Sequence, residues 1–236
     1  MRVVVSIGGS GLAPKLDASH VEAYASIIEE LVEAGCELAA VVGGGGVARQ
    51  YIEVARTMDA NEVQLDQLGI DVTRINARLL IAALGSIVDP KVAETYEDAG
   101  DVIRRGDVAI MGGVMPGQTT DAVAAALAEY IDAELLVYAT SVDGVYDADP
   151  SSGGEARKLE RLSPTELVDI IVPMSRDAGA SAPVDLLAAK LIERAGMRSI
   201  VLDGTDPSRI ATAILTGDHS GTDIVCADDP IALAHW

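Results

Sequence analysis

The sequence predicts an α/β protein, built as a three-layer α/β/α sandwich with a mostly parallel central sheet. Short apolar runs rich in Val, Ile and Leu alternate with longer segments in which apolar residues recur at helical spacing. This alternation is typical of a parallel sheet with helices on both faces. The 236 residues, 49% of them hydrophobic, suffice to bury the core of one large domain.

The first part of the chain shows the pattern. Arg2–Ile7 is a β-rich run, and the glycines that begin at Gly8 end it. Asp17–Ala34 carries apolar residues at helical spacing, with Gly35 as a natural stop. Leu38–Val42 is a second buried strand, followed by four glycines. A strand, a helix and a second strand therefore follow in order.

The remaining elements continue the alternation. Further strands are expected at Ser86–Val88, Asp107–Met111, Leu135–Ala139, Ser199–Leu202 and Asp223–Val225. Further helices are expected at Val47–Met58, Leu65–Leu84, Ala122–Ile131, Pro164–Ile171, Val184–Ala195 and Pro207–Leu215. Ala93–Ile103 is expected to be a surface segment, and Ser141–Arg157 a polar connection rich in turn residues. We expect a single domain over residues 1–226, in two lobes, and a tail over residues 227–236.

The charge balance is strongly acidic. The chain has 37 acidic and 17 basic residues, a formal net charge of -20. Such a field repels nucleic acid and anionic membranes, so neither is an expected partner. The acidic residues form either an interaction surface or an adaptation to molar salt. Because they are dispersed and lysine is scarce, we favour salt adaptation.

The sequence gives no indication of a membrane span, a secretory signal or a metal-binding site. No apolar run approaches the roughly 18 residues that a membrane span needs, and the first apolar run is too short for a secretory signal. We therefore expect a cytoplasmic protein. The two cysteines and three histidines show no metal spacing, so no metal-ligating residues are predicted in the chain itself.

Four of the predicted strands end in glycine-rich or polar turns at the edge where open α/β sheets bind ligands. The turns are Gly8-Gly9-Ser10, Gly43–Gly46, Gly112–Asp121 and Thr140–Tyr146. Glycines let backbone N–H groups converge on phosphate oxygens, and a helix start adds a positive dipole end. No Walker A motif is present. One match to a dinucleotide fingerprint follows the second strand without the required acidic partner, which disfavours an oxidoreductase.

In this order the turns resemble the amino acid kinase family, and within it the archaeal uridylate (UMP) kinases. The resemblance runs from Val3 to about Val225. The blocks that carry it are Ile7-Gly8-Gly9-Ser10, Val42–Gly46 with Ala48-Arg49, Asp66-x-x-Gly69-x-x-x-Thr73-x-x-Asn76-Ala77, Pro116-Gly117-x-Thr119-Thr120-Asp121, and Val142–Tyr146 with Asp149-Pro150. It implies an amino acid kinase-like fold and transfer of the γ-phosphoryl group of ATP to UMP, giving UDP and ADP in pyrimidine nucleotide synthesis. It also implies Mg²⁺ bound with ATP, and a homohexamer built as a trimer of dimers.

The resemblance implies an acceptor site in the N-terminal lobe and a nucleotide site in the C-terminal lobe. The matching UMP positions are Gly44, Asp66, Val114, Met115, Pro116, Gly117, Gln118, Thr119 and Thr120. The matching ATP positions are Gly9, Ser10, Gly45, Arg49, Thr140, Tyr146 and Asp149. The helix start at Thr119 and Thr120 suits a monophosphate.

Several of these residues have simpler interpretations. Asp66 can accept hydrogen bonds from ribose hydroxyls, or it can be a solvated helix residue. Arg49 can form a bidentate hydrogen bond to phosphate oxygens, or it can pair with Glu53 on the same helix. Tyr146 can be ordinary packing, and Asp149 an ordinary turn residue.

The matching catalytic positions are Asp121 and Asp185, which would orient cationic or metal groups near the transferred phosphoryl group. Asp185 can equally be a helix-start residue. Many family members carry lysines where this chain has Ser6 and Ser141. The groups that can take their place are Lys15, Lys190, Arg49, Mg²⁺ and the loop amides. We put Lys15 first, because it lies in the loop that the first glycine turn opens.

Two alternatives stay open. One is a kinase for another small phosphate or carboxylate, such as isopentenyl phosphate, acetylglutamate or carbamate. Isopentenyl phosphate sites in relatives use a histidine near the acceptor phosphate, and no histidine lies in these turns. The other is a nucleotide-binding regulator without catalysis, which the two missing lysines would suit.

If the surface is adapted to salt, the protein should become more stable as KCl rises. Repulsion between exposed carboxylates is screened within roughly 3 Å at 1 M salt. Thermal unfolding followed by circular dichroism over a KCl series measures this. A melting temperature that stays flat or falls would contradict the adaptation.

Overall fold

The structure, a computed structural model, describes residues 1–12, 17–148, 156–174 and 183–226. The strands in these ranges are β1 (Arg2–Ile7), β2 (Glu37–Val42), β3 (Ala109–Met111), β4 (Leu135–Thr140), β5 (Val145–Tyr146), β6 (Lys158–Leu159), β7 (Arg161–Leu162), β8 (Ser199–Asp203) and β9 (Thr222–Ile224). The helices are α1 (Gly9–Leu12), α2 (Ala18–Glu33), α3 (Gly45–Arg56), α4 (Glu62–Leu84), α5 (Tyr96–Arg104), α6 (Thr120–Tyr130), α7 (Pro164–Met174), α8 (Leu186–Ala195) and α9 (Ser208–Thr216).

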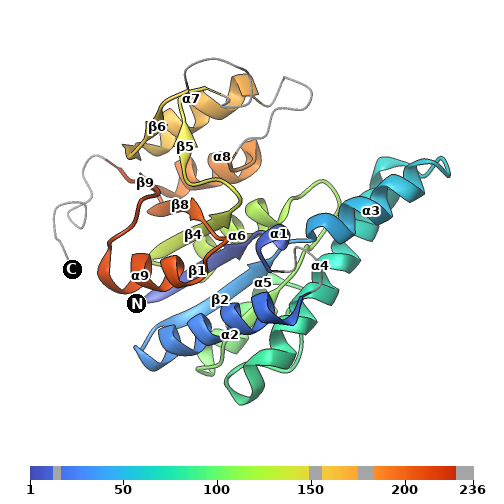
Figure 1. The fold of residues 1–236 in the computed structure, drawn as a ribbon, viewed down its shortest axis with the longest axis horizontal. Helices are drawn as coiled ribbons and strands as arrows, with labels where there is room; N and C mark the ends of the chain where they lie inside the picture. Colours follow the sequence, from blue (N-terminus) through green and yellow to red (C-terminus); the bar gives the residue numbers. More distant parts are fainter. Residues whose placement is uncertain (13–16, 149–155, 175–182, 227–236) are drawn as a thin grey trace.

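Seven of these strands form one sheet in the order β3-β2-β1-β4-β8-β9-β7, and its strands β2, β1, β4 and β8 are labelled in Figure 1. Each neighbouring pair from β3 to β8 is parallel. β9 returns antiparallel to β8. The predicted α/β class with a mostly parallel sheet is confirmed.

Two apolar cores lie on opposite faces of this sheet because successive strand residues point to opposite sides. Along β1, Val4 belongs to the core beneath α5, α6, α7 and α8. Val3 and Val5 belong to the core beneath α2, α4 and α9. Aromatic residues are only 3% of the chain. Small side chains therefore do much of the packing, and α6 buries four consecutive residues, Ala122–Ala125.

The ends of the helices follow local signals. Asp17 caps α2 by accepting a hydrogen bond from the Ser19 amide, and Gly35 just beyond the helix has φ of 86°. Asn61 and Gln64 form a reciprocal capping box at the start of α4. The two N-terminal caps fix where α2 and α4 begin.

Two predicted segments differ in the structure. Ser86–Val88 is not a strand: a 3₁₀ turn covers Gly85–Ile87, and Val88 makes only an isolated bridge to Val108. Ala93–Ile103 is not a surface segment, since α5 buries Ala99, Gly100, Val102 and Ile103. α5 spans only nine residues, and the prediction overlooked its buried residues although they recur at helical spacing.

The segment between β4 and α7 contains strands that the sequence pattern did not indicate. β5 and β6 pair as a small antiparallel sheet, and β7 joins the large sheet beside β9. Each of these three strands spans two residues. Strands this short carry no detectable alternation.

α3 and α4 pack against each other, and the outer end of this pair projects from the body of the protein (Figure 1). None of the described helices is both long enough and apolar enough to cross a membrane.

Candidate active site

The four turns singled out in the sequence meet at one edge of the sheet. Parallel strands end at the same edge, and the last residues of β1 and β2, Ile7 and Val42, are register partners. Ile7 also pairs with Ala139 near the end of β4, and Met111 at the end of β3 pairs with Val41. The turns therefore line up along the carboxyl ends of β3, β2, β1 and β4, as predicted.

The first two turns are in backbone-to-backbone contact. A Cβ atom on Gly9 would lie 2.2 Å from the amide nitrogen of Gly45 and 2.5 Å from the carbonyl oxygen of Gly43. These distances are far shorter than van der Waals contact, so only glycine fits at position 9. Gly45 has φ of 63°, a conformation that glycine adopts at no steric cost. We call the contacting residues Gly9, Gly43, Gly44 and Gly45 the glycine junction.

Asn76 of α4 holds the backbone of the glycine junction through hydrogen bonds of its side chain. Its side chain is 2% exposed. Its Nδ2 donates to the carbonyl oxygens of Gly43, at 2.9 Å, and Gly44, at 3.3 Å. These bonds occupy two acceptors that would repel an anion. Asn76 belongs to a block that carried the resemblance, but no role was predicted for it.

We call Gly112–Thr119 the acceptor loop, after the role that the family resemblance implies for it, and α4 holds this loop at both ends. At its start, the Gly113 amide donates to Thr73 Oγ1 at 2.7 Å, and Arg74 Nε donates to the Gly113 carbonyl oxygen at 3.2 Å. Near its other end, the Gly117 amide donates to Asp66 Oδ2 at 2.8 Å. Asp66 is thus in contact with the acceptor loop and is not a merely solvated helix residue. The anchoring role of Thr73 and Arg74 was not predicted.

The middle of the acceptor loop is accessible. Met115 is 51% exposed, and Val114, Pro116 and Gln118 are partly buried. Tyr96 at the start of α5 donates through its hydroxyl to Gln118 Oε1 at 3.5 Å. The loop is therefore fixed at its ends and along one side while its surface stays open to a ligand.

Two predicted catalytic carboxylates meet where α6 and α8 begin. Thr119 caps α6 by accepting from the Ala122 amide at 3.2 Å, and its hydroxyl also bonds to the Asp185 carboxylate. Asp185 caps α8, accepting from the amides of Leu187 at 2.7 Å and Ala188 at 3.0 Å. Asp185 is therefore a helix-start residue and also a neighbour of the acceptor loop.

Asp121, in the first turn of α6, has a perturbed acidity. Burial raises the pKa of its carboxyl to about 6, and the negative charge of Asp185 adds to the rise. The hydroxyl of Ser6 opposes the rise by donating to Asp121 Oδ1 at 3.0 Å. A carboxyl that titrates close to neutral pH beside a second carboxyl is typical of a functional site.

On the other side of the glycine junction lies the turn after β4. Thr140 at the end of β4 accepts from the Val142 amide at 3.0 Å. The Tyr146 hydroxyl donates to Asp143 Oδ1 at 2.8 Å, and Lys158 Nζ donates to Asp143 Oδ2 at 2.9 Å. Lys158 is a cation at this turn that the sequence did not single out, because β6 brings it there from a distant segment.

The remaining predicted residues are placed less fully. Lys15 and Asp149 lie outside the described residues. Ser10 belongs to α1, directly after Gly9, and only its backbone is described. Arg49 lies exposed on α3, close to the helix start at Gly45.

The described residues contain no group of three or more His, Cys, Asp or Glu side chains that could hold a metal ion. Asp121 and Asp185 are two neighbouring carboxylates at this edge. This arrangement suits Mg²⁺ that arrives with a nucleotide, because phosphate oxygens and water can supply most of its ligands.

A backbone-lined junction between two loops, with carboxylates beside it, is the arrangement of an α/β enzyme that transfers phosphoryl groups. Comparison with known proteins agrees with this class. The model of the amino acid kinase family matches residues 1–203. The chain belongs to the amino acid kinase family.

Within this family, the chain is similar to archaeal proteins named uridylate kinase. One from Haloquadratum walsbyi is 75% identical over 236 residues, which cover 100% of this chain and 98% of the relative. One from Halobacterium salinarum is 62% identical over the same shares of the two chains. The crystal structure of uridylate kinase from Archaeoglobus fulgidus is 42% identical, with a TM-score of 0.85, and covers 95% of this chain and 100% of that one.

The acidity of Asp121 predicts how its replacement affects stability. The folded protein holds the Asp121 proton more tightly than the unfolded chain, because the folded pKa of about 6 exceeds the ordinary value of 3.8. Ionisation therefore costs stability as pH rises through this range. Asp121→Asn should stabilise the protein at pH 8 by up to about 3 kcal/mol, and this gain should vanish near pH 4.

Urea unfolding at the two pH values measures this difference in the free energy of unfolding. Asp169→Asn, which removes an exposed carboxylate of α7, serves as the matched control. An Asp121→Asn variant that is no more stable than the control at pH 8 would contradict the assigned acidity.

Proposed function

We propose that this protein transfers the γ-phosphoryl group of ATP to UMP, giving ADP and UDP. The observation that carries the proposal is the order of the loops along the sheet. The acceptor loop follows β3, the glycine junction follows β2 and β1, and the polar turn follows β4. With strands about 4.8 Å apart, about 14 Å separate the first and last of these strands. This span suits two nucleotides that meet at their phosphates over the junction.

The relatives that carry the name uridylate kinase support UMP as the acceptor. In the proposal, the Asp66 carboxylate accepts hydrogen bonds from the ribose hydroxyls as well as from the Gly117 amide. The backbone and side chains of Val114–Thr120 surround the rest of UMP, and Gly44 lies beside its phosphate. Because α4 anchors this loop at both ends, the acceptor site is preorganised, and less ordering entropy is lost on binding.

The donor nucleotide occupies the opposite side of the junction. Gly9, Ser10 and Gly45 offer backbone N–H groups to its phosphates, and Arg49 adds a positive charge. Thr140, Tyr146 and Asp149 contact its nucleoside. The Tyr146 ring is held through the hydrogen bond of its hydroxyl to Asp143, which in turn pairs with Lys158.

Phosphoryl transfer depends on positioning and on stabilising the negative charge of the transferred group. Asp121 and Asp185 would orient the cationic groups around it, and Lys15 would supply one positive charge. Mg²⁺, held mostly by nucleotide oxygens and oriented by these two carboxylates, would supply further charge neutralisation when bound. The protein's own contribution is to hold the two phosphates in line and to present neutral donors to them.

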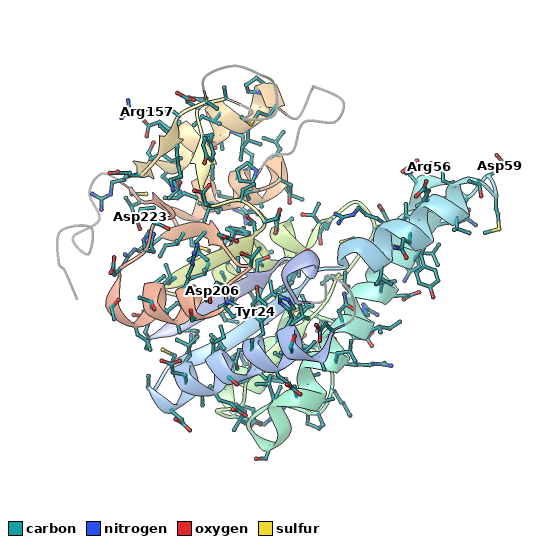
Figure 2. All side chains as sticks on the ribbon, viewed as in Figure 1. Tyr24, Arg56, Asp59, Arg157, Asp206 and Asp223 are labelled. Atoms are coloured by element: carbon teal, nitrogen blue, oxygen red, sulfur yellow. The ribbon has the colours of Figure 1, made fainter. Side chains whose placement is uncertain are left out.

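We also propose a homohexamer, a trimer of dimers, that works in the cytoplasm. The projecting α3–α4 pair supports an interface, because Tyr51, Val54, Met58 and Val63 are 57%, 59%, 69% and 62% exposed. Figure 2 shows that Arg56 and Asp59 lie at the tip of this pair. Sedimentation equilibrium in concentrated KCl should give six times the mass of one chain, and a monomer would contradict the proposal.

Purified protein in concentrated KCl with ATP and Mg²⁺ should release ADP when UMP is the acceptor. UMP, CMP, AMP and isopentenyl phosphate are compared in a coupled ADP-release assay, and UDP is identified by chromatography. We expect the highest kcat/KM with UMP. A higher value with isopentenyl phosphate would indicate a different acceptor. No release with any acceptor, together with tight UMP binding, would indicate a regulator.

A further inference from the structure

Ser6 is a buried polar residue in the middle of the sheet. It lies on β1 and is 3% exposed. In the register of the sheet it pairs with Val41 of β2 and Tyr138 of β4. A hydroxyl buried at this position is unfavourable unless it is hydrogen-bonded. Its partner is Asp121, because Ser6 Oγ donates to Asp121 Oδ1 at 3.0 Å.

Tyr138, the register partner of Ser6, reaches the same residue. Its side chain is fully buried. Its hydroxyl donates to the backbone carbonyl oxygen of Asp121 at 3.1 Å. Two neighbouring strands thus each send one hydroxyl to the first turn of α6, one to the carboxylate of Asp121 and the other to its main chain.

We propose that Ser6 and Tyr138 are positioning residues that hold the Asp121 carboxylate in place beside the phosphoryl group during transfer. The catalytic part of this inference rests on the proposed function. Both hydroxyls act through Asp121 and do not touch the substrate themselves.

A hydroxyl can orient the Asp121 carboxylate without changing the net charge of the site. A serine donor fixes the direction of the carboxylate but adds no charge, whereas a lysine in its place would neutralise it. Asp121 therefore keeps its negative charge for the cations that accompany the nucleotide. Asp185, at the start of α8, is the charged group that raises the pKa of Asp121, while the Tyr138 hydroxyl faces the main chain of Asp121 and has its own pKa raised by burial and by these two carboxylates.

Replacing Ser6 should impair the chemical step more than binding. We expect Ser6→Ala to lower kcat at least about tenfold, as for loss of a hydrogen bond to a charged group, while KM for UMP and for ATP changes less than about twofold. The acid limb of the pH–rate profile should move to higher pH, because the lost bond favoured the ionised carboxylate. Ser6→Thr, which keeps the hydroxyl, should restore most of kcat and the original limb.

Tyr138→Phe is the second variant, since it removes one oxygen and leaves the ring in the core. It should lower kcat with little change in either KM. The matched control is Ser199→Ala, which removes the hydroxyl of another fully buried strand serine, one that bonds to the Met197 carbonyl oxygen at 3.4 Å. The control should keep the kcat and pH profile of the parent protein.

Carboxyl ¹³C NMR of protein labelled at its aspartates gives a readout that does not depend on turnover. Assigned through Asp121→Asn, the Asp121 resonance should titrate at higher pH in Ser6→Ala than in the parent protein. An unchanged Asp121 titration in Ser6→Ala would overturn the proposal, as would parental kcat and pH limb in both folded variants. If the parent protein shows no turnover with UMP, the proposed function fails, while the NMR comparison still tests the positioning of Asp121.

Discussion

The close approach of Gly9 to Gly43 and Gly45 is the constraint on which the rest of the site depends. A single added Cβ at position 9 would overlap the backbone of the neighbouring turn. Because the two turns touch without side chains between them, their amides form one continuous surface at the centre of the sheet edge. The acceptor loop lies on one side of this surface and the polar turn after β4 on the other.

One helix ties most of this edge together. From α4, Asn76 holds the glycine junction, while Thr73, Arg74 and Asp66 hold the acceptor loop. The acidic charge of the chain makes these fixed backbone donors important. To bind two anionic nucleotides as proposed, a protein with a net charge of -20 must present hydrogen-bond donors locally against its own negative field. Backbone amides and hydroxyls donate hydrogen bonds without adding a positive charge that would pair with nearby carboxylates. The hydroxyls of Ser6 and Tyr138 likewise hold Asp121 through uncharged hydrogen bonds.

The fold and the position of the site could be predicted from local patterns. Apolar elements such as Arg2–Ile7 and Asp17–Ala34 were confirmed almost to the residue, and the predicted turns meet at one edge of the sheet as expected. Short elements were missed: α5 spans nine residues, and β5, β6 and β7 span two residues each. The supporting residues were missed for another reason. Lys158 reaches Asp143, and Tyr138 reaches Asp121, only through pairings that the folded sheet creates.

A crystal structure with UMP and a non-hydrolysable ATP analogue bound together tests the central claim most directly. The account predicts that the terminal phosphate of the analogue lies against the amides of the glycine junction and faces the UMP phosphate, with Asp121 beside both. Phosphates bound away from Gly9 and Gly45, or pointing away from each other, would contradict it.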